Sequence, residues 1–414
     1  MSRFIVLMLV STATICLPVG CQSIRQYPPV PANLQSVERG RAQDSNGDSI
    51  RHVDHEDWNS EERARPPENI LVLSGGGING AFSAGMLVGW TQSGNRPEFD
   101  IVTGVSTGAL IAPLAFLGTD YDEELKRLYT SESATRIYKI LPLFLWSNAV
   151  ASSKPLDTQI RSVVTQDLLD RIAQEHRHGR RLYIGTTNLD TQRPVVWDIG
   201  AIAAGHAPGK VKLVQDVILA SCSVPGLLPP IEINVEINGK RYSELHVDGG
   251  VGASMFLPPQ SLKPPSLSSF THLGTTSERM RQTTVYTIVA GKADPDPVPV
   301  KQGLLQLSGA SLSGVLRAQQ EHDLIRIYLL TYFANARFQL AAIPQEYAAP
   351  ASSLEFDLKT MRALFDEGQR LGSSSAVWTD TPPGIDPQSW TNPRTGTRLG
   401  SHSLSSSAVS GDRP

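Results

Sequence analysis

The feature that most constrains the fold is an apolar run that stops at three consecutive glycines and resumes as a run of small residues. It occupies residues 71–90 and reads LVLSGGGINGAFSAGMLVGW. An apolar run before glycine predicts a buried strand, and the small apolar residues after it predict a helix. Gly75, Gly77 and Gly80 also spell G-x-G-x-x-G. Bare backbone at this point fits either the pyrophosphate of a dinucleotide or the oxyanion of a reacting ester.

The same alternation of strand and helix patterns continues along the chain. Further strand patterns read FDIVTGVSTG, RLYIGTTNLD, VVWDIG and TTVYTIVAG, and helical spacing occurs in LVQDVILASCSV and FDLKTMRALFDEGQRLG. Strands that alternate with helices predict an α/β layered domain with a largely parallel central sheet. We place this domain at residues 68–372.

The N-terminal residues have the layout of a secretory signal peptide. Residues 1–20 contain a short positive start and an apolar stretch, and they run into LPVGC. This ending resembles the lipobox of bacterial lipoproteins, although Pro18 stands where leucine is preferred. We expect a signal peptide over residues 1–20 and a palmitate-bearing lipid anchor on Cys21. Gln22 then indicates the outer membrane of the bacterial cell envelope; a periplasmic or secreted protein cleaved nearby is the alternative.

Two further stretches lack apolar periodicity and are expected to lie outside the folded domain. Residues 21–67 are rich in Pro, Ser, Asn and charged residues, which predicts a disordered tether, because such a segment buries too little apolar surface to offset its ordering entropy. Residues 373–414 are rich in Ser, Pro and Gly and predict a flexible C-terminal tail.

Charge and ligand patterns point away from nucleic acids and metals. The formal net charge is −3 without a long basic run, so we expect no binding of nucleic acid through counterion release. His, Asp and Glu crowd together at residues 52–57, but no rigid element of a linker would fix the geometry of a metal site. The acidic residues of the domain lack calcium-loop spacing. We therefore expect no metal and no cofactor.

A second glycine cluster, GVSTG at Gly104–Gly108, directly follows the apolar run Ile101–Val102. This is G-x-S-x-G in the strand–turn–helix context of a nucleophile elbow, whose strained turn needs small neighbours. Such an elbow would expose the Oγ atom of Ser106 above the sheet. It would also place this residue at the N-terminus of a helix, whose positive end favours a developing oxyanion.

The two glycine clusters together favour the ester over the dinucleotide. A dinucleotide fingerprint expects an acidic residue at the carboxyl end of the second strand, whereas Asp100 lies at the start of that strand. A glycine-rich loop beside a serine at the end of a strand fits an oxyanion hole better. The amides of Gly75, Gly76 and Gly77 are the candidate donors.

A serine needs a base, and HVDGGV at residues 246–251 is the informative place to look. Asp248 follows a strand-like segment and precedes two glycines, so it can lie at the end of a strand and face a cleft. Asp-Gly-Gly is equally a plain turn sequence, and this motif alone does not distinguish the two.

The three motifs, in this order and spacing, resemble those of the patatin-like phospholipase family. The family has a glycine-rich oxyanion loop, a G-x-S-x-G serine and a later Asp-Gly-Gly, which match Gly75–Gly80, Gly104–Gly108 and Asp248–Gly250. Similar segments between them are KPLDTQI, TTNLDTQRPVVWDIG and ASCSVPGLLPPI, so the resemblance covers about residues 69–372. Ser74 departs from the pattern, since many members carry aspartate there.

The resemblance implies a three-layer α/β/α fold and a lipid acyl hydrolase of the phospholipase A, lysophospholipase or esterase type. It implies a dyad in which Ser106 is the nucleophile and Asp248 is the general base and acid. Gly75, Gly76 and Gly77 would form the oxyanion hole, and the remaining motif glycines are Gly80, Gly104, Gly108, Gly249 and Gly250. The implied partners are a lipid substrate and a membrane surface.

Two other interpretations remain open from the residues. One is an α/β-hydrolase-type carboxylesterase, whose Ser–Asp–His triad would need a late histidine such as His272 or His322. The other is a catalytically silent lipoprotein that binds lipid with the same fold. His246 could share a strand face with Asp248, which suggests a supporting role. The oligomeric state stays open.

Overall fold

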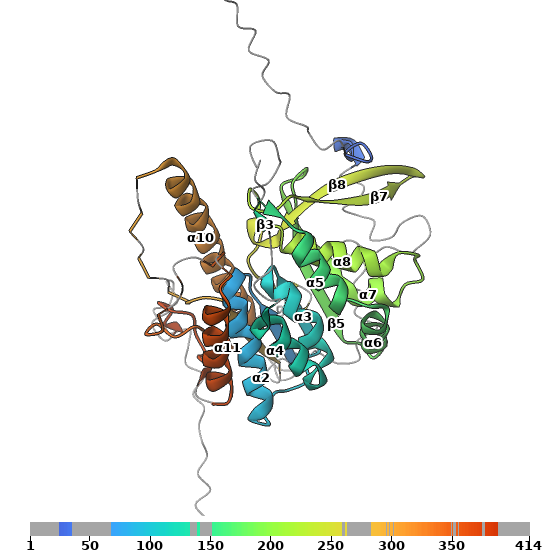
Figure 1. Ribbon diagram of the computed structural model, residues 1–414. Coiled ribbons are helices and arrows are strands. Elements are labelled where there is room, and N and C mark those ends of the chain that lie inside the picture. The colour runs from blue at the N-terminus through green and yellow to red at the C-terminus, as the bar shows by residue number, and fades with distance from the viewer. Residues whose placement is uncertain are drawn as a thin grey trace, which may run out of the picture.

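The computed structural model describes residues 25–34, 68–132, 139–140, 151–258, 261–262, 283–294 and most of 296–387. Within these residues a mixed sheet lies at the centre and helices cover both of its faces (Figure 1). The expected signal peptide, Cys21 and the histidine-rich stretch at residues 52–57 lie outside the described residues. No helix in the described part of the chain is long and apolar enough to span a membrane.

The strands of the sheet are β1 (Asn69–Leu73), β2 (Ile101–Val105), β5 (Arg181–Asn188), β6 (Arg193–Asp198), β7 (Ile231–Ile237), β8 (Lys240–Asp248), β9 (Thr284–Val289) and β10 (Arg337–Ala342). A separate two-stranded pair consists of β3 (Lys139–Ile140) and β4 (Ala151–Ser152). The helices are α2 (Gly80–Gln92), α3 (Thr107–Leu117), α4 (Asp122–Thr130), α5 (Lys154–Val163), α6 (Gln166–Arg177), α7 (Ile199–Ala204), α8 (Lys210–Ser221), α10 (Leu304–Phe333) and α11 (Leu358–Gly372).

The sheet has the strand order β10-β9-β1-β2-β5-β8-β7, and β6 pairs with β5 beside this path. The five strands from β10 to β5 are mutually parallel. Strands β6, β7 and β8 are antiparallel to their neighbours. Carboxyl ends of parallel strands meet at one edge of a sheet, which is where ligands bind in open α/β sheets. The largely parallel sheet predicted from the sequence is therefore confirmed.

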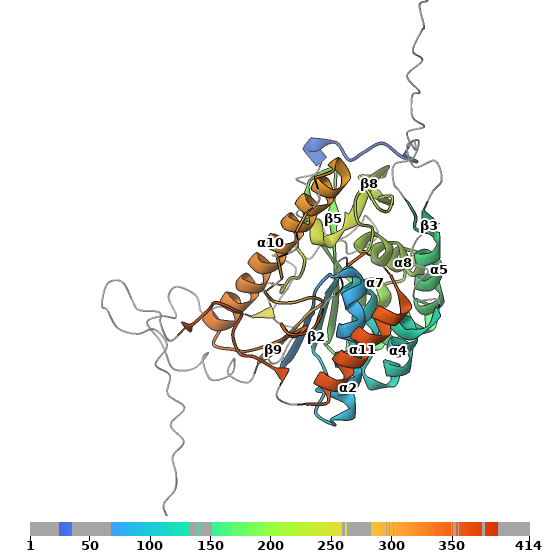
Figure 2. The same ribbon diagram turned by 60° about the vertical axis from the view of Figure 1, so that its left-hand side comes forward.

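The two faces of the sheet pack into two separate apolar cores, as the alternation of side chains along a strand requires. In β1, Leu71 and Leu73 belong to the core under α2, α3 and α11, while Ile70 and Val72 belong to the core under α10. Figure 2 shows α10 alone on one side of the sheet and the other large helices on the opposite side. This arrangement confirms a three-layer α/β/α architecture.

Residues 25–34 differ from the expected tether because they pack on the outer strands. Val30 is 4% exposed, and Pro29 forms a parallel bridge to Ser243 of β8. Arg25 forms an ion pair with Asp190, with 2.5 Å between Nη2 and Oδ1. The contact consists of one buried valine and backbone hydrogen bonds to β8, which require no apolar periodicity, so the composition of this stretch does not reveal it. We call residues 25–34 the N-terminal strap.

Residues just beyond α11 also differ from the expected flexible tail. Trp378 packs against Trp90 of α2, with ring centroids 4.7 Å apart, and against Tyr286 of β9, at 5.2 Å. Thr379 pairs with Leu340 of β10. A single tryptophan can dock a segment because it buries a large apolar area without a periodic pattern around it. The C-terminal boundary of packed structure therefore lies beyond residue 372.

Candidate active site

Ser106 occupies a strained turn between β2 and α3. Its backbone has φ 54° and ψ −123°, a positive φ that is uncommon for a residue other than glycine. The turn is tight because α3 begins at the next residue, Thr107. A Cβ atom at Gly104 would lie 2.4 Å from the carbonyl oxygen of Gly108, so the glycine permits this close approach. The geometry is that of a nucleophile elbow.

The hydroxyl of Ser106 meets the carboxyl group of Asp248 at the end of β8. The distance from Ser106 Oγ to Asp248 Oδ2 is 2.6 Å, and both side chains are buried. The other oxygen, Oδ1, accepts a hydrogen bond of 2.7 Å from the backbone N–H of Gly250. Strand β8 carries Asp248 to this position because its last residues pair with Thr186 and Thr187 of β5. The carboxyl group is thus held in one orientation.

Burial raises the pKa of Asp248 from 3.8 to about 6. The hydrogen bonds from Ser106 and from the Gly250 amide act in the opposite direction, because they stabilise the ionised form. A carboxylate with a pKa near 6 is a stronger base than an exposed aspartate, and it is still ionised at neutral pH. The site therefore offers a hydroxyl and a base in direct contact.

The glycine loop lies beside the elbow, but its first amide is already used. The N–H of Gly75, expected to contribute to the oxyanion hole, donates to the carbonyl of Ser254 at 2.9 Å, so this amide already has an acceptor. Gly77 lines the cavity above Ser106, and no hydrogen bond among the described residues occupies its amide or that of Gly76. These two glycines remain as candidate donors.

Ser74 fixes the same loop from the side of β9. Its hydroxyl donates to the Gly75 carbonyl at 2.8 Å and accepts from the Ala290 amide at 2.8 Å. Ser74 therefore braces the loop where many family members are expected to carry aspartate. The backbone also packs closely here, since a Cβ atom at Gly76 would lie 2.0 Å from the Ala290 carbonyl oxygen.

The other motif glycines allow close packing around the elbow. Added Cβ atoms would lie within 3 Å of neighbouring elements: Gly80 against Thr107 at 1.9 Å, Gly108 against the Leu73 carbonyl at 2.6 Å and Gly249 against the Gly185 carbonyl at 2.5 Å. At Gly250 the added atom would lie 3.0 Å from Asp248 Oδ1. The three motifs thus meet through backbone contacts that a larger side chain would disturb.

Two residues that the sequence did not single out hold the backbone of Ser106. The hydroxyl of Ser221, at the end of α8, accepts the Ser106 N–H at 2.9 Å and donates to the Gly185 carbonyl at 2.7 Å. The thiol of Cys222 donates to the Ser106 carbonyl at 3.1 Å. Burial, followed by the nearby charge of Asp248, raises the pKa of this thiol, so it stays protonated. The segment ASCSVPG carried the only sequence indication.

An apolar cavity of about 900 Å³, counting its open mouth, begins at Ser106. Leu110 and Pro113 of α3 line it, together with Ile160 of α5 and the segment before α11. Leu227 and Leu228, in the GLLPPI segment, also line it. Such a cavity suits a hydrocarbon chain whose polar end reaches the serine.

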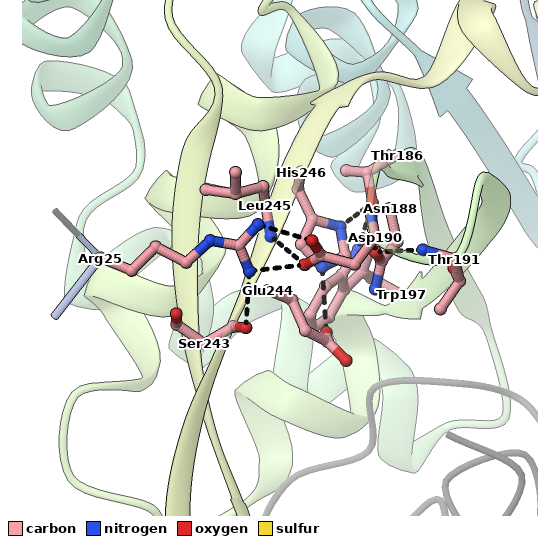
Figure 3. A network of polar contacts seen from close by, with 10 residues as sticks. All are labelled: Arg25, Thr186, Asn188, Asp190, Thr191, Trp197, Ser243, Glu244, Leu245 and His246. Carbon is pink, nitrogen blue, oxygen red and sulfur yellow. Dashed lines mark hydrogen bonds and ion pairs between the residues drawn. The ribbon is translucent and has the colours of Figure 1, made fainter. Parts of the chain in front are cut away.

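The histidines of the described residues do not complete a triad at Ser106. His322 is exposed on α10, and His272 lies outside the described residues. His246 is fully buried, and its ring contacts Thr186 Oγ1 at 2.9 Å and Glu244 Oε2 at 3.1 Å (Figure 3). The indole N–H of Trp197 donates to the same Thr186 oxygen at 2.8 Å. His246 therefore belongs to a separate polar cluster.

Within the described part of the chain, no group of three or more His, Cys, Asp or Glu side chains could hold a metal ion. The groups available for a reaction at Ser106 are a hydroxyl, a carboxylate and backbone amides.

Residues 71–259 match the family model described as patatin-like phospholipase. The cUMP-AMP-activated phospholipase of Escherichia coli is 28% identical over 197 residues, which are 45% of this chain and 55% of that protein. A patatin-like phospholipase domain-containing protein of Yarrowia lipolytica is 31% identical over 171 residues, which are 40% of this chain and 20% of that protein. The matched region thus spans between about a fifth and about half of these relatives.

A relative from Aspergillus terreus, also a patatin-like phospholipase domain-containing protein, is 30% identical over 209 residues, which are 49% of this chain and 27% of that protein. Among solved structures, VipD from Legionella pneumophila aligns over 74% of this chain and 68% of its own, with 12% identity and a TM-score of 0.33. A likeness at that TM-score bears on neither fold nor function.

Proposed function

The chain carries a patatin-like phospholipase domain, and on that premise we propose that it hydrolyses acyl esters of lipids through an acyl-enzyme on Ser106. The family supports lipid hydrolase activity in general terms. The observation that carries the finer proposal is the 2.6 Å contact between Ser106 Oγ and Asp248 Oδ2 at the mouth of an apolar cavity.

In the proposed first step, the Oγ atom of Ser106 attacks the ester carbonyl carbon while its proton moves to Asp248. The carbonyl oxygen becomes an oxyanion, which the amides of Gly76 and Gly77 are placed to stabilise. The tetrahedral intermediate collapses when the carbon–oxygen bond to the leaving alcohol breaks. Asp248 returns the proton to that alcohol, and the acyl group remains on Ser106.

In the second step, water attacks the acyl-enzyme and gives its proton to Asp248. The released products are the fatty acid and free Ser106, which recovers the proton. No histidine is required, because Asp248 contacts the hydroxyl directly and its pKa is raised to about 6 by burial. Burial thus compensates for the weak basicity of an ordinary carboxylate.

The cavity supports a lipid rather than a small polar ester as the substrate. Its lining is mostly apolar, including Leu156, Ile160 and Phe356, so an acyl chain can leave water there. The lipid anchor on Cys21 and a location in the bacterial cell envelope are part of the proposal, based on the LPVGC sequence. Intact-mass measurement of the membrane-extracted protein, compared with a Cys21→Ser variant, tests that anchor.

Labelling with a fluorophosphonate, together with hydrolysis of a defined lysophospholipid, tests the proposed chemistry. We expect the wild-type protein to be labelled and Ser106→Ala to be unlabelled and inactive. Asp248→Asn should lower the labelling rate and kcat by about 10²–10⁴-fold, the usual contribution of a general base.

Matched controls are Ser162→Ala on α5 and Asp167→Asn on α6, two exposed side chains away from the cavity. Both should keep wild-type labelling. A folded wild-type protein that resists the probe would favour the silent lipid-binding lipoprotein. Full activity in Asp248→Asn would instead favour a histidine triad.

A further inference from the structure

A buried carboxylate on α10 belongs neither to the dyad nor to the lining of the cavity. Asp323 is 5% exposed, and α10 lies on the face of the sheet opposite the other large helices (Figure 2). Burial raises the pKa of Asp323, because water no longer stabilises its charge. Hydrogen bonds from Gln319 and Ser254 act in the opposite direction, because they stabilise the ionised form. Aspartate is rarely buried, so the partners of this one indicate its role.

The two oxygens of Asp323 bind different parts of the chain. Oδ1 accepts from the side-chain amide of Gln319, one turn earlier on the same helix, at 3.1 Å. Oδ2 accepts from the backbone N–H of Ser254 at 2.7 Å and from the Ser254 hydroxyl at 3.2 Å. Ser254 is itself 6% exposed. The carboxylate therefore joins α10 to one buried loop residue, and all three of these partners are donors that require an acceptor at this position.

Ser254 connects this carboxylate to the glycine loop. Its carbonyl accepts the N–H of Gly75 at 2.9 Å. Gly75 lies directly against the nucleophile, since a Cβ atom added to it would lie 3.2 Å from Ser106 Cβ. The candidate donors of the oxyanion hole are the next two amides along the chain. A short series of hydrogen bonds thus leads from α10 to the loop that would bind the oxyanion.

Ser254 is also close in sequence to the proposed general base. Asp248 ends β8, and the turn Gly249–Val251 follows it. The N–H of Ala253 donates to the first carbonyl of this turn at 2.7 Å, and Ser254 is the next residue. The residue that Asp323 holds is therefore six positions after the base and in direct contact with the glycine loop.

We propose that Asp323 is a positioning residue, which fixes Ser254 so that the Asp248 turn and the glycine loop keep their places at Ser106. The inference rests on the function proposed above. Asp323 acts through Ser254 and touches neither member of the dyad. Oxyanion donors are effective only when they are held in place before the reaction, and a displacement of about 1 Å can cost about 10²-fold in rate. Without the acceptor, the buried Ser254 N–H loses its partner and the loop shifts to find another.

Asp323→Ala removes the acceptor, and its kinetics on a soluble short-chain ester test the proposal. We expect kcat to fall about tenfold or more while KM stays within about twofold, because the substrate still binds but the oxyanion donors are displaced. Asp323→Asn is the conservative variant and should stay within about threefold of wild type. Its amide oxygen can accept from Ser254, while its NH₂ group faces the oxygen of a turned Gln319 amide. Asp323→Leu, of similar volume and without an acceptor, is a second loss variant if the alanine protein does not fold.

Hydrogen exchange tests the same link without relying on activity. In Asp323→Ala or Asp323→Leu, the amides of Gly75 and Ser254 should exchange about tenfold faster or more, since their bonds open more often. Thr331→Ala is the matched control. Its hydroxyl is buried on the same helix but donates to the Ile327 carbonyl of that helix, at 2.8 Å. Thr331→Ala should keep wild-type kcat and wild-type protection of both amides.

Three results would overturn the proposal: wild-type kcat in folded Asp323→Ala and Asp323→Leu, an equal loss of kcat in Asp323→Asn, or an equal loss in Thr331→Ala. The last would assign the effect to the packing of α10 in general. Ser106→Ala should be inactive with wild-type protection of Gly75 and Ser254. If the wild-type protein hydrolyses no ester but Asp323→Ala still loses protection at Gly75, the proposed chemistry fails while the link from α10 to the glycine loop stands.

Discussion

Two buried polar clusters lie two residues apart on β8, and they differ in what they leave open. Asp248 contacts the Gly250 amide and Ser106, and Ser106 lines an apolar cavity. His246 contacts Thr186 and Glu244 and faces protein on all sides. Neighbouring positions on one strand face can thus have either a catalytic or a structural role. The groups that surround each side chain decide which role it has.

The His246 cluster has the complete hydrogen bonding expected of a structural network. The Trp197 indole N–H can only donate, so Thr186 Oγ1 accepts a hydrogen bond from it. The Thr186 hydroxyl can then donate its own hydrogen bond to His246 Nδ1. An imidazole protonated on Nε2 then donates to Glu244. Figure 3 shows this cluster beside Arg25 of the strap and Asp190. Such a satisfied network rigidifies the strand that ends at Asp248.

The largest expected effect concerns the acid dependence of the dyad. Asp248 must be ionised to accept the proton, and burial raises its pKa to about 6. We expect kcat/KM on a neutral soluble ester to fall about tenfold per pH unit below pH 6 and to stay level above it. A pH–rate profile measures this limb. A profile level down to pH 4.5 would contradict the assignment of Asp248 as the base.

The second prediction contrasts the two clusters by the sign of their stability effects. His246→Ala should lower the free energy of unfolding by about 3 kcal/mol, because it leaves a cavity and removes a partner from Glu244 and Thr186. Asp248→Asn should instead raise it by roughly 1–3 kcal/mol at pH 8, because the wild-type protein holds a buried charge there.

The pH dependence of that gain follows from the raised pKa. The folded state binds the Asp248 proton more tightly than the unfolded state, so its destabilising effect develops as pH rises from about 4 to 6. The advantage of Asp248→Asn should therefore vanish below pH 4. Urea unfolding at both pH values measures this. An Asp248→Asn variant less stable than wild type at pH 8 would show that the carboxylate is structural.

The smallest expected effect concerns the strap. Arg25→Ala removes a partly exposed ion pair with Asp190 and should cost about 0.5–1 kcal/mol. It should leave soluble-ester turnover unchanged, because Arg25 reaches β8 only through Asp190 and the backbone of Leu245 and Ser243. Thermal unfolding and kinetics measure both. Arg370→Ala, which removes the exposed ion pair with Glu367 on α11, is the comparison, and an equal loss there would assign the effect to surface charge.

Much of the site was predictable because its motifs are local. Gly104 is demanded by the sharp turn of its own motif, whereas Gly108 and Gly249 meet the carbonyls of Leu73 and Gly185, which are distant in the sequence. Gly75 could not be judged this way, since the carbonyl that occupies its amide belongs to Ser254, far along the chain. Ser221 was missed for the same reason, because its contact with Ser106 joins α8 to the elbow.

The sequence by itself determined the alternation of strands and helices and the strained serine turn, because these depend on nearest neighbours. Only the tertiary structure decided which hydrogen-bonding groups remain open and which surface stays exposed. Those depend on segments that meet across the sheet, as when β8 carries Asp248 to Ser106 and the strap docks on the outer strands. The burial of a side chain and its hydrogen-bond partner are set by these contacts between distant segments, and no local sequence pattern encodes them.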